Sequence, residues 1–251
     1  MIKGICKFCG QEKELINSHI IPKSLCRINE IGPMVAIDSK RNTFEHNPIH
    51  QNGKKEYLMC KDCDNLLGIL DNYGNKVFRE IIPEHKWDLV DGYLLCKLLP
   101  NEVDYWTLKK FFISVIWRAS VDSSGINLGK YEDIALKMLK GELPDNPNFF
   151  VPLIYKMNTN TPLDLSTGIF GNKTLGKRIY EIQFPHYKIM ILPSIEHSQN
   201  QKEIEQFKLF YNPKFIIVQT FFLPSPSDNH LIDVVKKCQN NELRRNNKII
   251  T

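Results

Sequence analysis

The chain has 251 residues, and its composition of 42% hydrophobic, 24% charged and 10% aromatic residues excludes an intrinsically disordered protein. No apolar run reaches the roughly 18 residues that a membrane span needs. The first residues lack the apolar core of a signal peptide, so we expect a cytoplasmic protein without a membrane partner. The net charge of +5 is concentrated in residues 236–251. We therefore expect no tight, non-specific binding to DNA at physiological salt.

Four of the seven cysteines form two C-x2-C pairs, Cys6 with Cys9 and Cys60 with Cys63. In a reducing compartment such pairs indicate a metal site rather than disulfides. Two unrelated buried pairs or a redox motif are the alternatives, but neither pair follows a thioredoxin-like pattern. We therefore predict that all four thiolates hold one structural Zn2+. The isolated cysteines are expected to be buried thiols: Cys26, Cys96 and Cys238.

The segment after the second cysteine pair has the periodicity of helices. Apolar residues recur at steps of three and four from Leu66 to Ile81, which predicts an amphipathic helix that Pro83 ends. The same spacing predicts helices over residues 108–119 and 131–139. Within the first of these, Trp117 and Arg118 are interpreted as core with a charged flank rather than as a single-stranded nucleic-acid site.

Beyond these helices the pattern changes to short apolar runs separated by Pro, Asn and Gly. Strands are predicted at residues 149–155, 178–184, 187–192 and 215–222, followed by a closing helix from Asp228. We predict an α+β protein with two domains. Residues 1–84 form a zinc-stapled module, and residues 88–251 form an α+β domain with helices and a mainly antiparallel sheet that selects a target or senses a partner.

A histidine motif lies between the two cysteine pairs. The first pair is followed by Ser18, His19, Ile20, Ile21 and Pro22, and the second pair leads directly into the first predicted helix. This order of knuckle, looped segment, second knuckle and helix is that of a treble-clef, or ββα-metal, module. Over residues 6–72 the chain resembles the HNH endonuclease family, in its subgroup with a four-cysteine structural zinc.

The resemblance implies a metal-dependent endonuclease that hydrolyses phosphodiester bonds in nucleic acid. It implies that His19 is the general base that activates water, and that an asparagine orients this base. Asn47 is one candidate for that asparagine, and Asn42 and Asn52 are equally open. It also implies a carboxylate on the helix that helps to hold Mg2+ or Mn2+. The candidates for that ligand are Asp71 and Asp64, then Asn65 and Asn72, with His46 and His50 as further alternatives.

Two departures from the family pattern keep a second hypothesis open. Ser18 stands where many members carry Asp or Glu before the base, and no histidine follows Cys63 on the helix. A hydroxyl is a weaker ligand for Mg2+ than a carboxylate. The alternative function is therefore a catalytically inactive, zinc-stapled module that binds nucleic acid or protein. A third hypothesis makes residues 88–251 the functional part and the zinc module its scaffold.

The expected partner is nucleic acid, with DNA favoured over RNA. Residues 88–251 are the expected contact for a protein partner or a second copy of the chain. Proteins that resemble this one occur in bacterial defence and on mobile elements, which associates the chain with antiviral defence.

Overall fold

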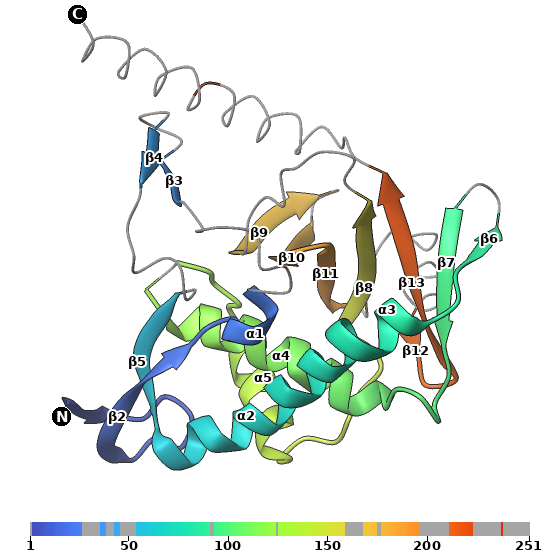
Figure 1. Ribbon diagram of the computed structural model, residues 1–251. Helices are drawn as coiled ribbons and strands as arrows, with labels where there is room; N and C mark the ends of the chain where they lie inside the picture. The colour runs from blue at the N-terminus through green and yellow to red at the C-terminus, as the bar shows by residue number, and fades with distance from the viewer. Residues whose placement is uncertain are drawn as a thin grey trace, which may run out of the picture.

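The computed structural model describes residues 2–26, 36–38, 43–45, 54–90, 93–123, 125–158, 168–174, 177–195, 211–222 and 237. Within these ranges, helices pack against one face of a large sheet, and a small sheet lies at one end of the molecule (Figure 1). The predicted α+β class is confirmed. No helix in the described part of the chain is long and apolar enough to cross a membrane.

The small sheet contains the first cysteine pair and the histidine motif. Its antiparallel strands, in the order β1-β2-β5, are β1 (Ile2–Ile5), β2 (Glu12–His19) and β5 (Lys55–Cys60). The turn between β1 and β2 is closed by a hydrogen bond from the Gly10 N–H to the Cys6 carbonyl, and Gly10 has a φ of +73° that other residues rarely adopt. Three short elements lie between β2 and β5: α1 (Lys23–Cys26) and the paired β3 (Ala36–Asp38) and β4 (Thr43–Glu45).

The first predicted helix is confirmed as one continuous helical run. It consists of α2 (Lys61–Lys76), a π-helical turn (Val77–Ile81) and α3 (Ile82–Glu84). The run continues through Pro83 and ends one residue later, at Glu84, whereas the sequence predicted that Pro83 would end it. The π-helical turn ends at Ile81, two residues before Pro83, which cannot donate the i to i−4 hydrogen bond of a regular α-helix.

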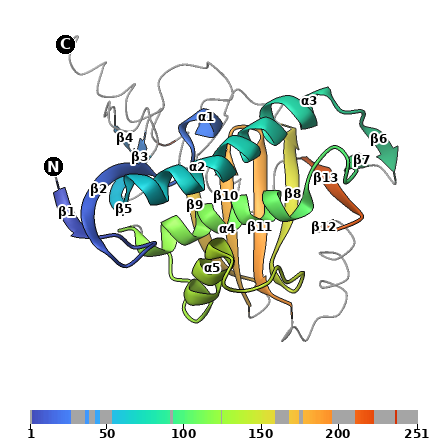
Figure 2. The same ribbon diagram turned by 90° about the horizontal axis from the view of Figure 1, so that it is seen from below.

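The other two predicted helices are α4 (Tyr105–Val121) and α5 (Tyr131–Lys140). Helices α2 and α4 run antiparallel across one face of the large sheet, with α5 beside α4 (Figure 2). The close approach of α2 to α4 requires Gly74, because a Cβ atom there would lie 2.7 Å from the Phe111 ring. Gly74 is a weak helix former, and its role here is to let the two helices pack closely.

Gly74→Ala should destabilise the protein by about 1 to 3 kcal/mol, since the added methyl group overpacks the contact between α2 and α4. Gly68 is the matched control on the same helix, because a Cβ atom there meets nothing within 4 Å. Gly68→Ala should stabilise by about 0.5 to 1 kcal/mol through helix propensity. Urea denaturation of both variants measures the difference, and equal changes would contradict this packing.

The large sheet has the strand order β6-β7-β13-β8-β11-β10-β9, with β12 paired to β13. Its strands are β6 (Asp88–Val90), β7 (Tyr93–Leu98), β8 (Phe149–Asn158), β9 (Gly168–Thr174), β10 (Lys177–Phe184), β11 (Tyr187–Ser194), β12 (Tyr211–Asn212) and β13 (Phe215–Phe222). All pairs are antiparallel except β13 with β8. The four predicted strands are confirmed, and the predicted helix from Asp228 lies outside the described residues.

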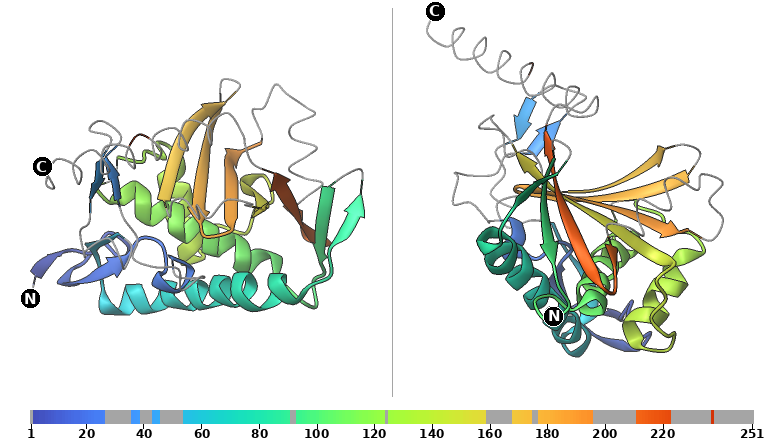
Figure 3. Two further views of the ribbon diagram at one scale, coloured as in Figure 1. Left: turned by 45° about the horizontal axis from the view of Figure 1, so that its top comes forward. Right: turned by 90° about the vertical axis from the view of Figure 1, so that its right-hand side faces the viewer.

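One hydrophobic core extends from the cysteine module into the large sheet. Phe8 packs edge-on against Trp117 of α4, and Phe78 packs against Phe184 and Tyr187 of the sheet. Figure 3 shows the N-terminal strands at one end of α2 and the β6–β7 hairpin at the other. The predicted boundary between a domain of residues 1–84 and a domain of residues 88–251 stays a prediction. The described residues on its two sides share buried contacts.

Candidate functional site

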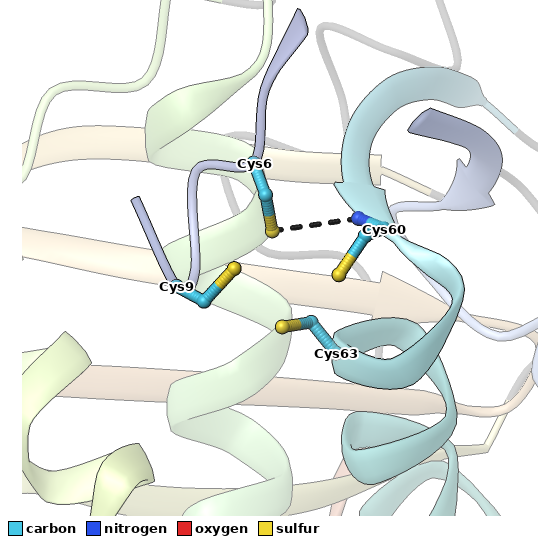
Figure 4. Close-up of side chains that lie close together, drawn as sticks. All are labelled: Cys6, Cys9, Cys60 and Cys63. Atoms are coloured by element: carbon cyan, nitrogen blue, oxygen red, sulfur yellow. Dashed lines mark hydrogen bonds between the residues drawn. The ribbon is translucent and has the colours of Figure 1, made fainter. Parts of the chain in front are cut away.

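The four predicted zinc ligands come together at one point. Cys6 and Cys9 lie in the turn after β1, Cys60 ends β5, and Cys63 lies in the first turn of α2 (Figure 4). Their Sγ atoms all lie within 4.8 Å of one another. Tetrahedral Zn–S bonds of about 2.3 Å place the sulfurs about 3.8 Å apart, so the cluster fits one zinc ion. Together these residues form a four-cysteine cluster that could hold a metal ion and that joins both knuckles.

The surroundings of the cysteines favour a thiolate at Cys6. Burial acts to raise the pKa of its thiol, but hydrogen bonds from the backbone N–H groups of Cys9, Cys60 and Phe8 outweigh burial and lower the pKa to about 7. The Cys60 N–H lies 3.4 Å from the Cys6 Sγ atom. Burial, followed by the neighbouring sulfurs, raises the pKa of Cys63. A bound cation would offset that cost by stabilising the thiolate form.

His19 is the last residue of β2 and lies at the opposite end of this strand from the cysteines. Leu15 pairs with Cys60 and His19 pairs with Lys55, so His19 is four residues, or about 13 Å, farther along the strand. Asp71 is eight residues after Cys63, which is about 12 Å along α2. Both residues therefore lie well away from the cysteine cluster, each along its own element.

Arg118 of α4 connects these two residues directly. Its Nη1 atom donates to the His19 carbonyl at 3.0 Å and to Asp71 Oδ2 at 2.9 Å, while its Nη2 atom donates to Asp71 Oδ1 at 2.6 Å. The remaining N–H groups contact Ser114, at its carbonyl and its hydroxyl. All five guanidinium donors thus have an acceptor, although the Arg118 side chain is only 2% exposed.

The two candidate carboxylates differ in position. Asp64 is next to Cys63, about 10 Å along the helix from Asp71, and therefore lies at the zinc end of α2. Asp71 lies at the His19 end, but both of its oxygens bind Arg118, which offsets its negative charge. Among the described residues, His19, Asp64 and Asp71 do not form a second group of metal ligands like the cysteine cluster.

Ser18 also differs from a metal ligand. Its side chain is 2% exposed, and among the described residues its hydroxyl has no hydrogen-bond partner. The hydroxyl thus lies in the interior beside β5 and not on an open face. Several predicted site residues lie outside the described residues: Asn42, His46, Asn47, His50 and Asn52.

Arg118 is the residue that the sequence-based interpretation misplaced. It was assigned to the charged flank of a core helix, whereas the structure buries it with Trp117. The spacing in the sequence could have predicted this burial. Arg118 lies seven residues after Phe111 and therefore on the apolar stripe of α4. A buried arginine requires acceptors, but spacing alone does not identify which ones.

Lys109 is a second buried cation of α4, and its titration should be visible in the stability of the protein. Burial lowers the pKa of Lys109 to about 7, which nearby Asp145 only partly opposes. The unfolded chain, with a lysine pKa near 10.4, then binds more protons from about pH 7 to 9.5. The free energy of unfolding should therefore rise with pH in this window, by on the order of 1 kcal/mol per pH unit.

Denaturant unfolding across this pH window tests the assignment. Lys109→Met should remove the rise, because the variant has no buried amine to protonate. Lys110→Met is the matched control, since Lys110 is the partly exposed neighbour that pairs with Asp145 at 3.2 Å. An unchanged rise in Lys109→Met would show that another group causes it.

Comparisons of the chain with protein-family models, with curated proteins and with solved structures find no match. The features of the chain that bear on its function are therefore the four-cysteine cluster and the surroundings of His19.

Proposed function

We propose that the protein is a metal-dependent endonuclease of the HNH type, which hydrolyses phosphodiester bonds in nucleic acid with His19 as the general base. The observation that supports the proposal is the position of His19. It ends a strand whose other end joins the cysteine cluster, and Arg118 donates both to the His19 carbonyl and to Asp71 of the following helix.

In this proposal the four cysteines bind a structural zinc ion that fixes β5 and the start of α2 relative to the first knuckle. The neutral imidazole of His19 takes the proton from the attacking water, the role of general base in which histidine acts most often. A divalent cation, Mg2+ or Mn2+, would stabilise the charge that develops on the phosphate and on the leaving oxygen. Among the described residues, Asp64 and Asp71 are the candidate carboxylate ligands for this cation.

A cleavage assay on supercoiled plasmid and on single-stranded RNA, with Mg2+ or Mn2+, tests the proposal. His19→Ala should lower the rate by at least about 100-fold, because it removes the base. His85 is the matched control, since it pairs with Glu102 at 2.9 Å and lies roughly 20 Å along the helical run from Asp71. His85→Ala should cleave like the wild type.

The assay also distinguishes DNA, the substrate we favour, from RNA. Equal cleavage by wild type and His19→Ala at matched zinc content would refute His19 as the base. We propose antiviral defence as the biological role. Expression of the wild type and of His19→Ala in phage-challenged bacteria tests it, because only the wild type should protect the cells.

The second candidate function is a catalytically inactive zinc module that binds nucleic acid or protein. The buried Ser18 hydroxyl and the ion-paired Asp71 favour it, because neither offers a free carboxylate beside His19. This function predicts binding of nucleic acid or of a protein partner that does not depend on His19, with no cleavage by the wild type.

A further inference from the structure

The end of β2 is held by polar contacts from outside the cysteine module. Arg118 belongs to α4, 99 residues after His19 in the sequence, yet donates to the His19 carbonyl. This carbonyl belongs to the peptide group that follows His19, so fixing it restricts the backbone from which the imidazole extends. The N–H of the same peptide group, that of Ile20, donates to the Lys54 carbonyl.

A second group of contacts joins the end of α4 to the start of β5. Lys54 Nζ lies 3.0 Å from Asp122 Oδ2, and the Asp122 side chain is fully buried. Glu56 Oε2 accepts hydrogen bonds from both the N–H and the hydroxyl of Ser123, each at 2.9 Å. Since Glu56 pairs with Ser18 across the small sheet, these contacts also support the strand end that carries His19.

We propose that Arg118, with Asp71, is a positioning residue for His19, and that the end of α4 fixes the direction of the imidazole. The inference rests on the proposed function only for its effect on catalysis. Helix α4, which lies outside residues 6–72, thereby contributes a positioning residue to the histidine site. A planar guanidinium suits this role because it binds a carboxylate through two nitrogens while one of them also reaches a carbonyl.

The test replaces the guanidinium by an ammonium and follows His19 by NMR. Arg118→Lys keeps the charge but cannot bind both Asp71 oxygens and the His19 carbonyl together. We expect the imidazole 15N and 1H signals of His19 to shift, the tautomer ratio to change, and kcat to fall roughly 10- to 100-fold with KM nearly unchanged. Arg178→Lys is the matched control, because Arg178 is exposed and its guanidinium donates to the Asn127 carbonyl.

Asp71→Asn provides a second variant if Arg118→Lys does not fold. It keeps the shape and one acceptor, and should shift the same His19 signals. Unchanged His19 signals in a folded variant, or equal shifts in Arg178→Lys, would overturn the positioning role. A wild type without nuclease activity would refute the proposed function, but the His19 signals would still decide whether Arg118 positions the imidazole.

Discussion

Removal of zinc should unfold the cysteine module and lower the thermal stability of the whole chain. Metal analysis should find one zinc per chain, and a strong chelator or Cys6→Ser should abolish it. Structural zinc contributes roughly 10 kcal/mol or more to the folding of small zinc modules. In this protein the loss of structure should extend from the cysteine module to α4, because Phe8 from the first knuckle packs against Trp117 in the shared core.

Hydrogen exchange shows where the structure is lost. Fast exchange should appear in β1, β2 and β5 first, and α4 should follow only partly. Cys26→Ser is the matched control, because Cys26 is buried but lies outside the four-cysteine cluster. It should retain one zinc per chain. Full zinc binding in Cys6→Ser, or a wild type that binds none, would contradict the assigned site.

Breaking the ion pair between Arg118 and Asp71 should be the most destabilising change away from the zinc. Arg118→Met should cost about 3 to 5 kcal/mol, because it leaves the carboxylate of Asp71, whose side chain is only 18% exposed, without its cation. The double variant Arg118→Met with Asp71→Leu should recover much of this loss, since an apolar pair of similar volume avoids the uncompensated charge.

A double-mutant cycle measured by urea denaturation tests this coupling. The control is Lys137→Met, which breaks the pair that Lys137 forms with Asp133 at 2.7 Å on the exposed side of α5. That variant should unfold like the wild type, because solvent screens exposed pairs. Additive effects of the Arg118 and Asp71 changes would show that the two side chains do not stabilise each other.

The features predicted from sequence are those with a local signal. The C-x2-C spacing identified the four clustered cysteines, and the apolar period identified α2, α4 and α5 to within a few residues. In the large sheet, strands β6, β7, β9 and β12 were missed. In β7 the fully buried side chains are Cys96 and Leu98 alone, so the apolar alternation is weak. Gly74 illustrates the same limit, because its role depends on a Phe111 ring that reaches it only after α2 and α4 pack.

The surroundings of His19 depended on contacts that no spacing encodes. Asp71 and Arg118 are 47 residues apart, and Lys54 and Asp122 meet only because the end of α4 reaches the start of β5. The sequence could thus predict His19 as a candidate base but not the buried arginine that holds its backbone. Whether Asp64 or Asp71 serves a metal stays a prediction.

The pH dependence of single-turnover DNA cleavage by wild type and His19→Ala tests the central claim most directly. The account predicts that the wild-type rate rises with pH and levels off once the His19 imidazole has lost its proton, because only the neutral ring accepts a proton from water. His19→Ala should be at least about 100-fold slower and lack this rise. The same rise in His19→Ala, or a zinc-loaded wild type that cleaves no nucleic acid, would contradict the claim.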